Sequence, residues 1–309
     1  MRILLLGSFG QVGWELRRSL APLGEVIAPV RPGPVGLTGD LSDLDGLANT
    51  VDEARPDIIV NAAAFTDVDA AEDDPEQARL INAQAPGVLG RAAERQGAVL
   101  VHYSTDYVFD GTGREPWTEG DETRPVNVYG RTKLEGEESI SASAGRHMIF
   151  RTSWVFSARR RNFLRTMLRL AQERDQLQVV NDQFGAPTSA ELVADVTAHA
   201  VRMASSDSRL DGIYHLAARG ETTWYDYARL AVGRGRELGM LSRITAADIY
   251  PVASEAFPTR APRPHNSRLD TAKLETAFQL ELPPWTDGVE RALNELASEY
   301  GATREGAAG

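Results

Sequence analysis

The sequence contains no cysteine among its 309 residues. This absence excludes disulfide bonds, thiol nucleophiles and metal sites with cysteine ligands. It is also consistent with a reducing compartment, and we expect a cytoplasmic protein. No run approaches the roughly 18 apolar residues that a membrane-spanning helix needs. The apolar run at the N-terminus is too short for a secretory signal and leads directly into a glycine-rich segment. We therefore expect no association with a membrane.

An excess of positive charge is also missing. The formal net charge is −11, which argues against broad binding to nucleic acid, because the phosphate backbone attracts basic surfaces. An acidic chain can still bind an anionic nucleotide through local backbone donors and a few arginines. Hydrophobic residues make up 42% of the chain, enough for a sizeable core in one large or two modest domains.

The first half of the chain alternates short apolar runs with amphipathic stretches. This pattern predicts strands and helices in turn. The strands are expected over residues 2–6, 25–30, 57–62, 98–103 and 147–151, and the helices over 11–23, 44–54, 74–96 and 129–141. Such alternation predicts right-handed crossovers and a parallel, doubly wound sheet of the Rossmann type in an α/β protein. Ligands of these sheets bind at the carboxyl ends of the strands.

The pattern changes after about residue 155. Here we expect helices over 162–174 and 190–203, a strand over 212–216, and then many prolines with one final helix over 286–300. We interpret residues 1–155 as the Rossmann domain and residues 156–300 mainly as a smaller C-terminal lobe, with some later segments returning to the sheet. Residues 301–309 are small and polar, which is typical of a frayed tail.

A glycine-rich turn follows the first predicted strand. Residues 7–13 form the pattern G-x-x-G-x-x-G between a strand and a helix. Glycines there permit positive φ and let the backbone approach a pyrophosphate at a helix N-terminus, although a plain tight turn has the same spacing. The strand–turn–helix context favours a dinucleotide cofactor bound by the Rossmann domain. The turn residues assigned to it are Gly7, Gly10, Gln11, Val12 and Gly13.

The end of the second strand indicates which dinucleotide, NADPH or NADH, the protein prefers. A carboxylate there binds the ribose diol of NAD, whereas this chain has Val30 followed by Arg31. An arginine would attract the 2′-phosphate, so we expect NADPH to be preferred over NADH, unless Arg31 is a solvated surface residue. Further cofactor contacts are assigned to the adenine edge and to the ends of the third and fourth strands, at Asp40, Leu41, Ala63, Ala64, Phe65 and Tyr103.

The strongest chemical signal is Tyr129 with Lys133, a Y-x-x-x-K pair. Spacing i,i+4 places the phenol and the ammonium on one face of a helix. Reduction of a ketone leaves an alkoxide that needs a proton, and a nearby ammonium lowers the tyrosine pKa from about 10. We also expect both residues to contact the cofactor. Thr105, at the end of the fourth strand, would hydrogen-bond the substrate oxygen beside Tyr129.

At this point the sequence closely resembles the dTDP-4-dehydrorhamnose reductase family, a branch of the extended short-chain dehydrogenases/reductases. The resemblance covers almost the whole chain, and its longer late motifs are more specific than the glycine turn. The resemblance rests on residues 10–16, 61–64, 104–111, 129–137, 151–155, 181–188, 224–225 and 263–267.

The resemblance implies NADPH-dependent reduction of dTDP-4-dehydro-L-rhamnose to dTDP-L-rhamnose. Tyr129 would donate the proton, Lys133 would tune it and hold the ribose, and Thr105 would polarise the keto oxygen. Substrate contacts are implied for Asp106 and Trp154, and for Arg263 and Asn266 at the nucleotide or diphosphate. Arg263 could instead pair with a carboxylate, and both alternatives stay open.

The same resemblance implies a homodimer joined through magnesium. The matching carboxylates are Glu15, Glu191 and Glu295. Oxygen ligands suit Mg²⁺, but three exposed glutamates are also typical of an ordinary solvated surface. One departure from the family is Val30, where relatives often carry an acidic residue. This departure puts shared use of NADH in doubt.

Other functions share the same fold and the threonine–tyrosine–lysine set. A sugar-nucleotide dehydratase needs a second carboxylate after Asp106, and this chain has Tyr107 there. An epimerase is harder to exclude by chemistry, but the late motifs do not fit one. A non-catalytic regulatory subunit of the S-adenosylmethionine synthetase type would not need an intact Thr105, Tyr129 and Lys133.

Overall fold

The computed structural model describes residues 1–30, 36–143 and 145–306. Arg31, the residue assigned to the cofactor phosphate, lies outside the described residues, as do the last three residues of the predicted tail.

The first lobe is built on a six-stranded sheet in the order β10-β5-β4-β3-β1-β2. Every pairing in it is parallel, which confirms the predicted doubly wound sheet. The strands are β1 (Arg2–Leu6), β2 (Glu25–Ile27), β3 (Ile58–Asn61), β4 (Val99–Thr105), β5 (His147–Thr152) and β10 (Gly212–His215). Strand β2 ends at Ile27, so the prediction that it continues to residue 30 is wrong.

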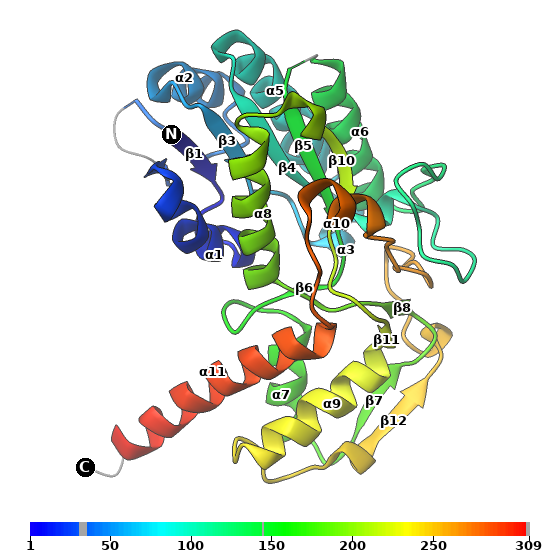
Figure 1. The fold of residues 1–309 in the computed structure, drawn as a ribbon. Coiled ribbons are helices and arrows are strands. Elements are labelled where there is room, and N and C mark those ends of the chain that lie inside the picture. Colours follow the sequence, from blue (N-terminus) through cyan, green and yellow to red (C-terminus); the bar gives the residue numbers. More distant parts are fainter. Residues whose placement is uncertain (31–35, 144, 307–309) are drawn as a thin grey trace.

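Helices cover both faces of this sheet (Figure 1). One face carries α1 (Gln11–Leu20), α8 (Ala190–Ala204) and α10 (Ala272–Phe278), and the other α2 (Leu44–Ala54), α5 (Ala85–Gln96) and α6 (Val128–Ala142). Successive side chains of a strand point to opposite faces. Ile3 and Leu5 accordingly join the core under α1 and α8, while Leu4 and Leu6 join the core under α2 and α5. A continuous apolar run thus becomes a strand buried on both sides.

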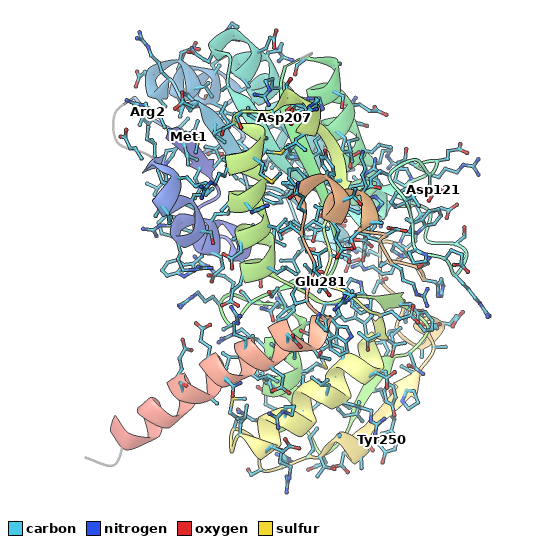
Figure 2. All side chains as sticks on the ribbon, in the orientation of Figure 1. Met1, Arg2, Asp121, Asp207, Tyr250 and Glu281 are labelled. Atoms are coloured by element: carbon cyan, nitrogen blue, oxygen red, sulfur yellow. The ribbon has the colours of Figure 1, made fainter. Side chains whose placement is uncertain are left out.

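The second lobe has its own apolar core, formed mainly by three helices and a two-stranded sheet. These elements are α7 (Phe163–Glu173), α9 (Trp224–Glu237), α11 (Trp285–Gly306), β7 (Leu177–Val180) and β12 (Ile249–Val252). They lie below the carboxyl edge of the main sheet in Figure 1. Figure 2 shows two opposite ends of the molecule. Met1 and Arg2 lie at the amino edge of the sheet, and Tyr250 lies at the outer side of the second lobe.

In the C-terminal part of the chain, the helices of the structure differ from the predicted ones. The final helix predicted over residues 286–300 is present as α11, but two further helices in the last hundred residues, α9 and α10, were not predicted. The buried stripe of α9 is made largely of small residues, such as Ala228 and Ala231, between arginines, so its periodicity is weak in the sequence. Helix α11 continues to Gly306 instead of ending at residue 300.

Short elements complete the fold. The helical ones are α3 (Val68–Asp73) and α4 (Pro75–Arg79), a π-helical turn over Leu80–Gln84, and 3₁₀ turns at Ala21–Leu23, Asp106–Val108, Ser208–Leu210, Ala246–Asp248 and Ser254–Ala256. The remaining strands are β6 (Val155–Phe156), which pairs with β9 (Thr188–Ser189), and β8 (Phe184–Gly185), which pairs with β11 (Thr222–Thr223). Across the described part of the chain, no helix is long and apolar enough to cross a membrane.

Candidate active site

A cleft of about 660 Å³ lies where the carboxyl ends of the main strands meet the second lobe. This volume is within the range of ligand pockets, which is about 300–1,000 Å³. Its lining comes from the turn after β1, the ends of β3, β4 and β5, the start of α6, and the aromatic residues of the second lobe. The cleft therefore occupies the position at which doubly wound sheets bind ligands.

The glycine turn forms one end of the cleft. Gly7, Gly10, Gln11 and Val12 line it. Gly13 does not line the cleft: a Cβ there would lie 2.0 Å from the Gly7 carbonyl oxygen, so Gly13 permits the close packing of helix α1 on the turn. Helix α1 begins without a side-chain cap and has no acidic residue in its first turn. Its first backbone N–H groups are therefore left for an anionic ligand.

The other assigned cofactor residues are divided between the cleft and the core. Ala63 and Ala64 line the cleft, as the sequence predicts for small residues at the end of β3. Leu41 is fully buried in the core under α2, so its side chain packs the fold and does not reach the cleft. Asp40 accepts hydrogen bonds from the backbone and side chain of Ser42. Phe65 packs on the core, and its backbone groups bond to the Asn82 side chain.

Thr105, Tyr129 and Lys133 all line the cleft. Thr105 ends β4, and its Oγ1 accepts from the backbone N–H of Tyr107 at 3.2 Å. Tyr129 lies in the first turn of α6, which is capped by Asn127. Burial raises the pKa of Tyr129 to about 12, and a hydrogen bond with the Thr105 side chain acts in the opposite direction. Lys133 is not among the groups that shift this pKa in the structure, so its role in tuning Tyr129 stays a prediction.

The Lys133 amine is buried and held by contacts with strand β4. Its Nζ donates to the Tyr103 carbonyl oxygen at 2.6 Å and lies 3.0 Å from Nε2 of His102. The Lys133 side chain is 1% exposed, and burial lowers its pKa to about 8. Tyr103 lines the cleft, but its hydroxyl bonds to Thr197 of α8 at 2.8 Å. Nothing in the sequence analysis singles out His102.

Asp106 presents a buried carboxyl group to the cleft. Its Oδ1 accepts from the Thr105 hydroxyl at 3.2 Å. Its Oδ2 is buried and has no hydrogen-bond partner within the described residues. Burial raises the pKa of Asp106 to about 7. Near neutral pH the group can therefore either donate or accept a hydrogen bond toward a ligand.

The wall opposite the sheet is aromatic. Trp154 lines the cleft and stacks on Trp224 with ring centroids 3.6 Å apart and an interplanar angle of 15°. Its backbone has φ of 48°, a conformation that is rare for a bulky residue and is often found at functional sites. A Cβ at Gly185 would lie 2.8 Å from the Trp154 ring, so this glycine permits the close packing of the indole. The indole is therefore clamped in place beside Phe163 and Tyr227, which also line the cleft.

Two residues assigned to the nucleotide form hydrogen bonds with other residues of the chain. Arg263 donates to the Asp69 carboxylate at 2.8 Å. Of the two roles left open for Arg263, the structure thus shows the pairing with a carboxylate. Asn266 is 1% exposed, and its amide donates to the carbonyl oxygens of Thr112 and Glu115. Neither residue is among those that line the cleft.

Two arginines beside the glycine turn were missed by the sequence analysis. Arg160 and Arg161 both line the cleft. Arg160 has φ of 62°, and its Nε donates to the Phe9 carbonyl oxygen at 2.9 Å, which links the second lobe to the glycine turn. The run Arg159-Arg160-Arg161 was the available signal. Arg159 differs, because it pairs with Glu295 at 3.0 Å and is not a lining residue.

The three glutamates assigned to magnesium are neighbours. Burial raises the pKa of Glu15, and Glu191 and Glu295 raise it further. Each glutamate also faces an arginine: Arg18, Arg291 and Arg159 lie 3.8, 3.4 and 3.0 Å from Glu15, Glu191 and Glu295, respectively. Within residues 1–30, 36–143 and 145–306, no group of three acidic, histidine or cysteine side chains is placed to hold a metal ion.

Known proteins resemble this chain over nearly its whole length. The family model described as the RmlD substrate binding domain matches residues 1–298. The dTDP-4-dehydrorhamnose reductase of Escherichia coli (strain K12) is 54% identical over 296 residues, which are 96% of this chain and 98% of that protein.

Solved structures agree with this match. The crystal structure of dTDP-4-dehydrorhamnose reductase from Bacillus anthracis in complex with NADP has a TM-score of 0.83 and 32% identity, covering 95% of this chain and 99% of that one. A dTDP-4-dehydrorhamnose reductase from Clostridium acetobutylicum has a TM-score of 0.84 and 34% identity, covering 96% and 99%. With matches of this extent to the sequence, to the family model and to the fold, the chain belongs to the dTDP-4-dehydrorhamnose reductase family.

Proposed function

We propose that the protein reduces dTDP-4-dehydro-L-rhamnose to dTDP-L-rhamnose with NADPH, in dTDP-rhamnose biosynthesis. The observation that carries this proposal is the shared cleft: the glycine turn, Thr105, Tyr129 and Lys133 all border it in a chain 54% identical to a named reductase. NADP is bound in the related B. anthracis structure, which supports NADP(H) here.

The residues at one end of the cleft fit a dinucleotide. The uncapped start of α1 leaves backbone N–H groups without an intrahelical partner, which suits a pyrophosphate. Ala63 and Ala64 leave room above the sheet, and Arg160 and Arg161 add positive charge beside the turn. We propose that these groups hold NADPH, which when bound supplies the hydride.

The residues of the chain then control the proton and the keto group. We infer that Tyr129 donates its phenolic proton to the oxygen of the keto carbon as that carbon is reduced. Hydrogen bonding with Thr105 places the Tyr129 hydroxyl, and Thr105 would polarise the same oxygen. The protonated form of Asp106 would donate a hydrogen bond to the sugar through the otherwise unpartnered Oδ2. Trp154, held against Trp224, would provide an apolar surface beside the sugar.

We also propose a division of labour between the lobes. Residues 1–155, with β10 and α8 added to them, would bind the cofactor. The part of residues 156–300 that forms the second core would close over the substrate, since Trp154 stacks on Trp224 of that lobe.

The dimer and the magnesium ion stay predictions. Glu15, Glu191 and Glu295 lie close enough to raise the pKa of Glu15, and a second copy could supply three more carboxylates. A cation would then compete with the three arginines that now face these glutamates.

The decisive experiment is NADPH consumption, followed by absorbance, with a panel of keto-sugar nucleotides. We expect fast turnover with dTDP-4-dehydro-L-rhamnose and at least about tenfold lower kcat/KM with sugars that differ at the reacting ring. A faster reaction with another keto-sugar nucleotide would replace the substrate assignment. If no keto-sugar is reduced while NADPH still binds, the regulatory-subunit alternative would gain support.

A further inference from the structure

Four buried polar side chains that border the cleft carry an atom without a hydrogen-bond partner within the described residues. They are Ser104, Asp106, Thr152 and Tyr227. Buried polar groups are nearly always hydrogen-bonded, and leaving one unpaired is costly, so such a group beside a cleft is a candidate contact for a ligand. Asp106 is assigned to the sugar above, but Thr152 has no role in the reduction as described so far.

Thr152 lies at the carboxyl end of β5, directly beside Thr105. The two residues are partners in the parallel register of β4 and β5, so their side chains lie on the same face of the sheet, on strands about 5 Å apart. Thr105 in turn is hydrogen-bonded to Tyr129. The Thr152 hydroxyl is therefore one strand away from the two residues proposed to handle the keto oxygen.

The other two unassigned groups are placed differently. Successive side chains of a strand alternate between its faces, so Ser104 points to the opposite face of β4 from Thr105. Tyr227 belongs to the core of the second lobe, where its ring packs against Phe156 and Trp285. Of these three groups, Thr152 is the one that shares a face of the sheet with the reacting centre.

The core on this face of the sheet offers the Thr152 hydroxyl no partner. Phe150, two residues earlier on β5, faces the same way and joins an apolar core with Val193 and Ala194 of α8. Valine has nearly the shape of threonine without the hydroxyl, so it would fill this position without burying an unpaired polar group. The hydroxyl thus contributes nothing favourable to folding, which points to a ligand in the cleft.

The order of the strands indicates which ligand group reaches β5. The glycine turn follows β1, with β2 on one side of it and β3, β4 and β5 in succession on the other. A dinucleotide with its pyrophosphate at this turn directs its adenine half toward β2 and its other half over β3 and β4. Thr105 and Tyr129 mark the place of the reacting nicotinamide carbon, and the carboxamide is attached to the next carbon of that ring. The end of β5 is the next strand in the same direction.

We propose that the Thr152 hydroxyl binds the carboxamide of the nicotinamide and thereby orients the ring at the reacting end of the cleft. A threonine hydroxyl can donate to the amide oxygen or accept from the amide nitrogen, so it suits either group of the carboxamide. The assignment rests on the proposed function, because it takes the cofactor to be NADPH. It adds a contact at the nicotinamide end, whereas the glycine turn and the neighbouring arginines are assigned to the pyrophosphate.

NADPH binding tests this proposal without turnover. We expect Thr152→Val to raise the dissociation constant of NADPH, measured by fluorescence titration, about tenfold. The comparison ligand is 2′-phospho-ADP-ribose, which has the adenine half and the pyrophosphate but no nicotinamide. Its dissociation constant, measured by displacement of NADPH, should change by less than about twofold. Thr152→Ser keeps the hydroxyl and should retain most of the affinity for NADPH. An equal loss of affinity for both ligands in Thr152→Val would overturn the proposal.

Ser153→Ala is the matched control. Ser153 is the next residue along the chain, is also buried, and also has an unpartnered hydroxyl within the part of the chain that the structure describes, but it does not line the cleft. We expect the dissociation constant of NADPH in this variant to stay within about twofold of the parent value. Equal losses in Thr152→Val and Ser153→Ala would indicate a general effect on this end of the strand and would overturn the proposal.

Thermal unfolding separates a ligand contact from a structural role. Without cofactor, Thr152→Val should unfold at the same temperature as the parent or at a higher one, because the variant no longer buries an unpaired hydroxyl. At one fixed concentration of NADPH, the rise in the unfolding temperature should be smaller in the variant than in the parent, because the variant binds NADPH more weakly. A variant that is clearly less stable than the parent without cofactor would show that the hydroxyl stabilises the fold itself, which would overturn the proposal.

Steady-state kinetics test the other ligand that could use the hydroxyl, which is the sugar. A higher KM for the keto-sugar in Thr152→Val, with an unchanged dissociation constant for NADPH, would place the hydroxyl on the substrate and overturn the proposal. If the parent reduces the keto-sugar and Thr152→Val binds NADPH as the parent does, this inference alone is refuted. If the parent binds NADPH but reduces no keto-sugar, the proposed function is refuted, and the binding comparison still decides the role of Thr152.

Discussion

Asp106 should make the stability of the protein depend on pH in a direction opposite to that of most aspartates. Its side chain is 2% exposed, and burial raises its pKa from 3.8 to about 7, against the lowering effect of hydrogen bonds from Ser267 and Thr105. The folded protein therefore binds this proton more tightly than the unfolded chain does. The stability that it contributes is complete below about pH 4 and is lost as the pH rises through about 7.

The size of the effect follows from the two pKa values. One pKa unit corresponds to about 1.36 kcal/mol, so ionisation of Asp106 should lower the free energy of unfolding by about 4 kcal/mol over the whole range, and by about 2.5 kcal/mol between about pH 5 and about pH 8. Asp106→Asn keeps the shape of the side chain and removes its ionisation. The difference in unfolding free energy, parent minus variant, should fall by about 2.5 kcal/mol over that interval.

Urea unfolding of both proteins at several pH values between about 5 and 8 gives this difference, in which the titration of the other groups cancels. Asp110→Asn is a suitable control, because the pKa of Asp110 is lowered by hydrogen bonds with Thr112. The stability tied to that residue is lost only in more acidic solution, so its difference should stay flat. A parent-minus-variant difference for Asp106 that is constant to within about 0.5 kcal/mol would refute the reasoning.

The remaining predictions concern the cofactor, the proton donor and the dimer. Tyr129→Phe should keep NADPH affinity but lower turnover at least about 10²-fold; turnover within about threefold of the parent would remove Tyr129 as the proton donor. NADPH should give a higher kcat/KM than NADH, and Arg31→Ala should narrow that gap by about 10- to 150-fold; a parent preference for NADH would contradict this. Arg161→Ala should raise the dissociation constants of NADPH and NADH alike by about tenfold, measured by fluorescence titration, whereas Arg159→Ala should leave both unchanged; equal effects of the two variants would argue against a diphosphate contact. EDTA should lower the mass found by light scattering at low micromolar protein if magnesium joins a dimer, and an unchanged mass would leave the three glutamates as surface charges.

Local patterns were sufficient for most of the first lobe. The predicted strand over residues 2–6 and the helix over 44–54 match β1 and α2 in full. The predicted helix over 129–141 differs from α6 by one residue at each end. These elements depend on apolar periodicity and glycine punctuation within a short window, which is information the chain carries locally. The helices of the second lobe were harder to predict from the sequence, because α9 packs through small residues and leaves little periodic signal.

Residue types at strand ends were enough to anticipate which chemistry the cleft contains, because parallel strands bring their carboxyl ends to one edge. The amino-acid sequence alone thus determined the doubly wound sheet, the glycine turn, and the set Thr105, Tyr129 and Lys133 beside one cleft. The tertiary structure decided what each side chain contacts. Lys133 meets His102 from a different element, Leu41 enters the core, and Arg263 reaches Asp69. Such contacts join residues far apart in the chain, so they depend on how elements pack against each other, and no local pattern encodes that packing.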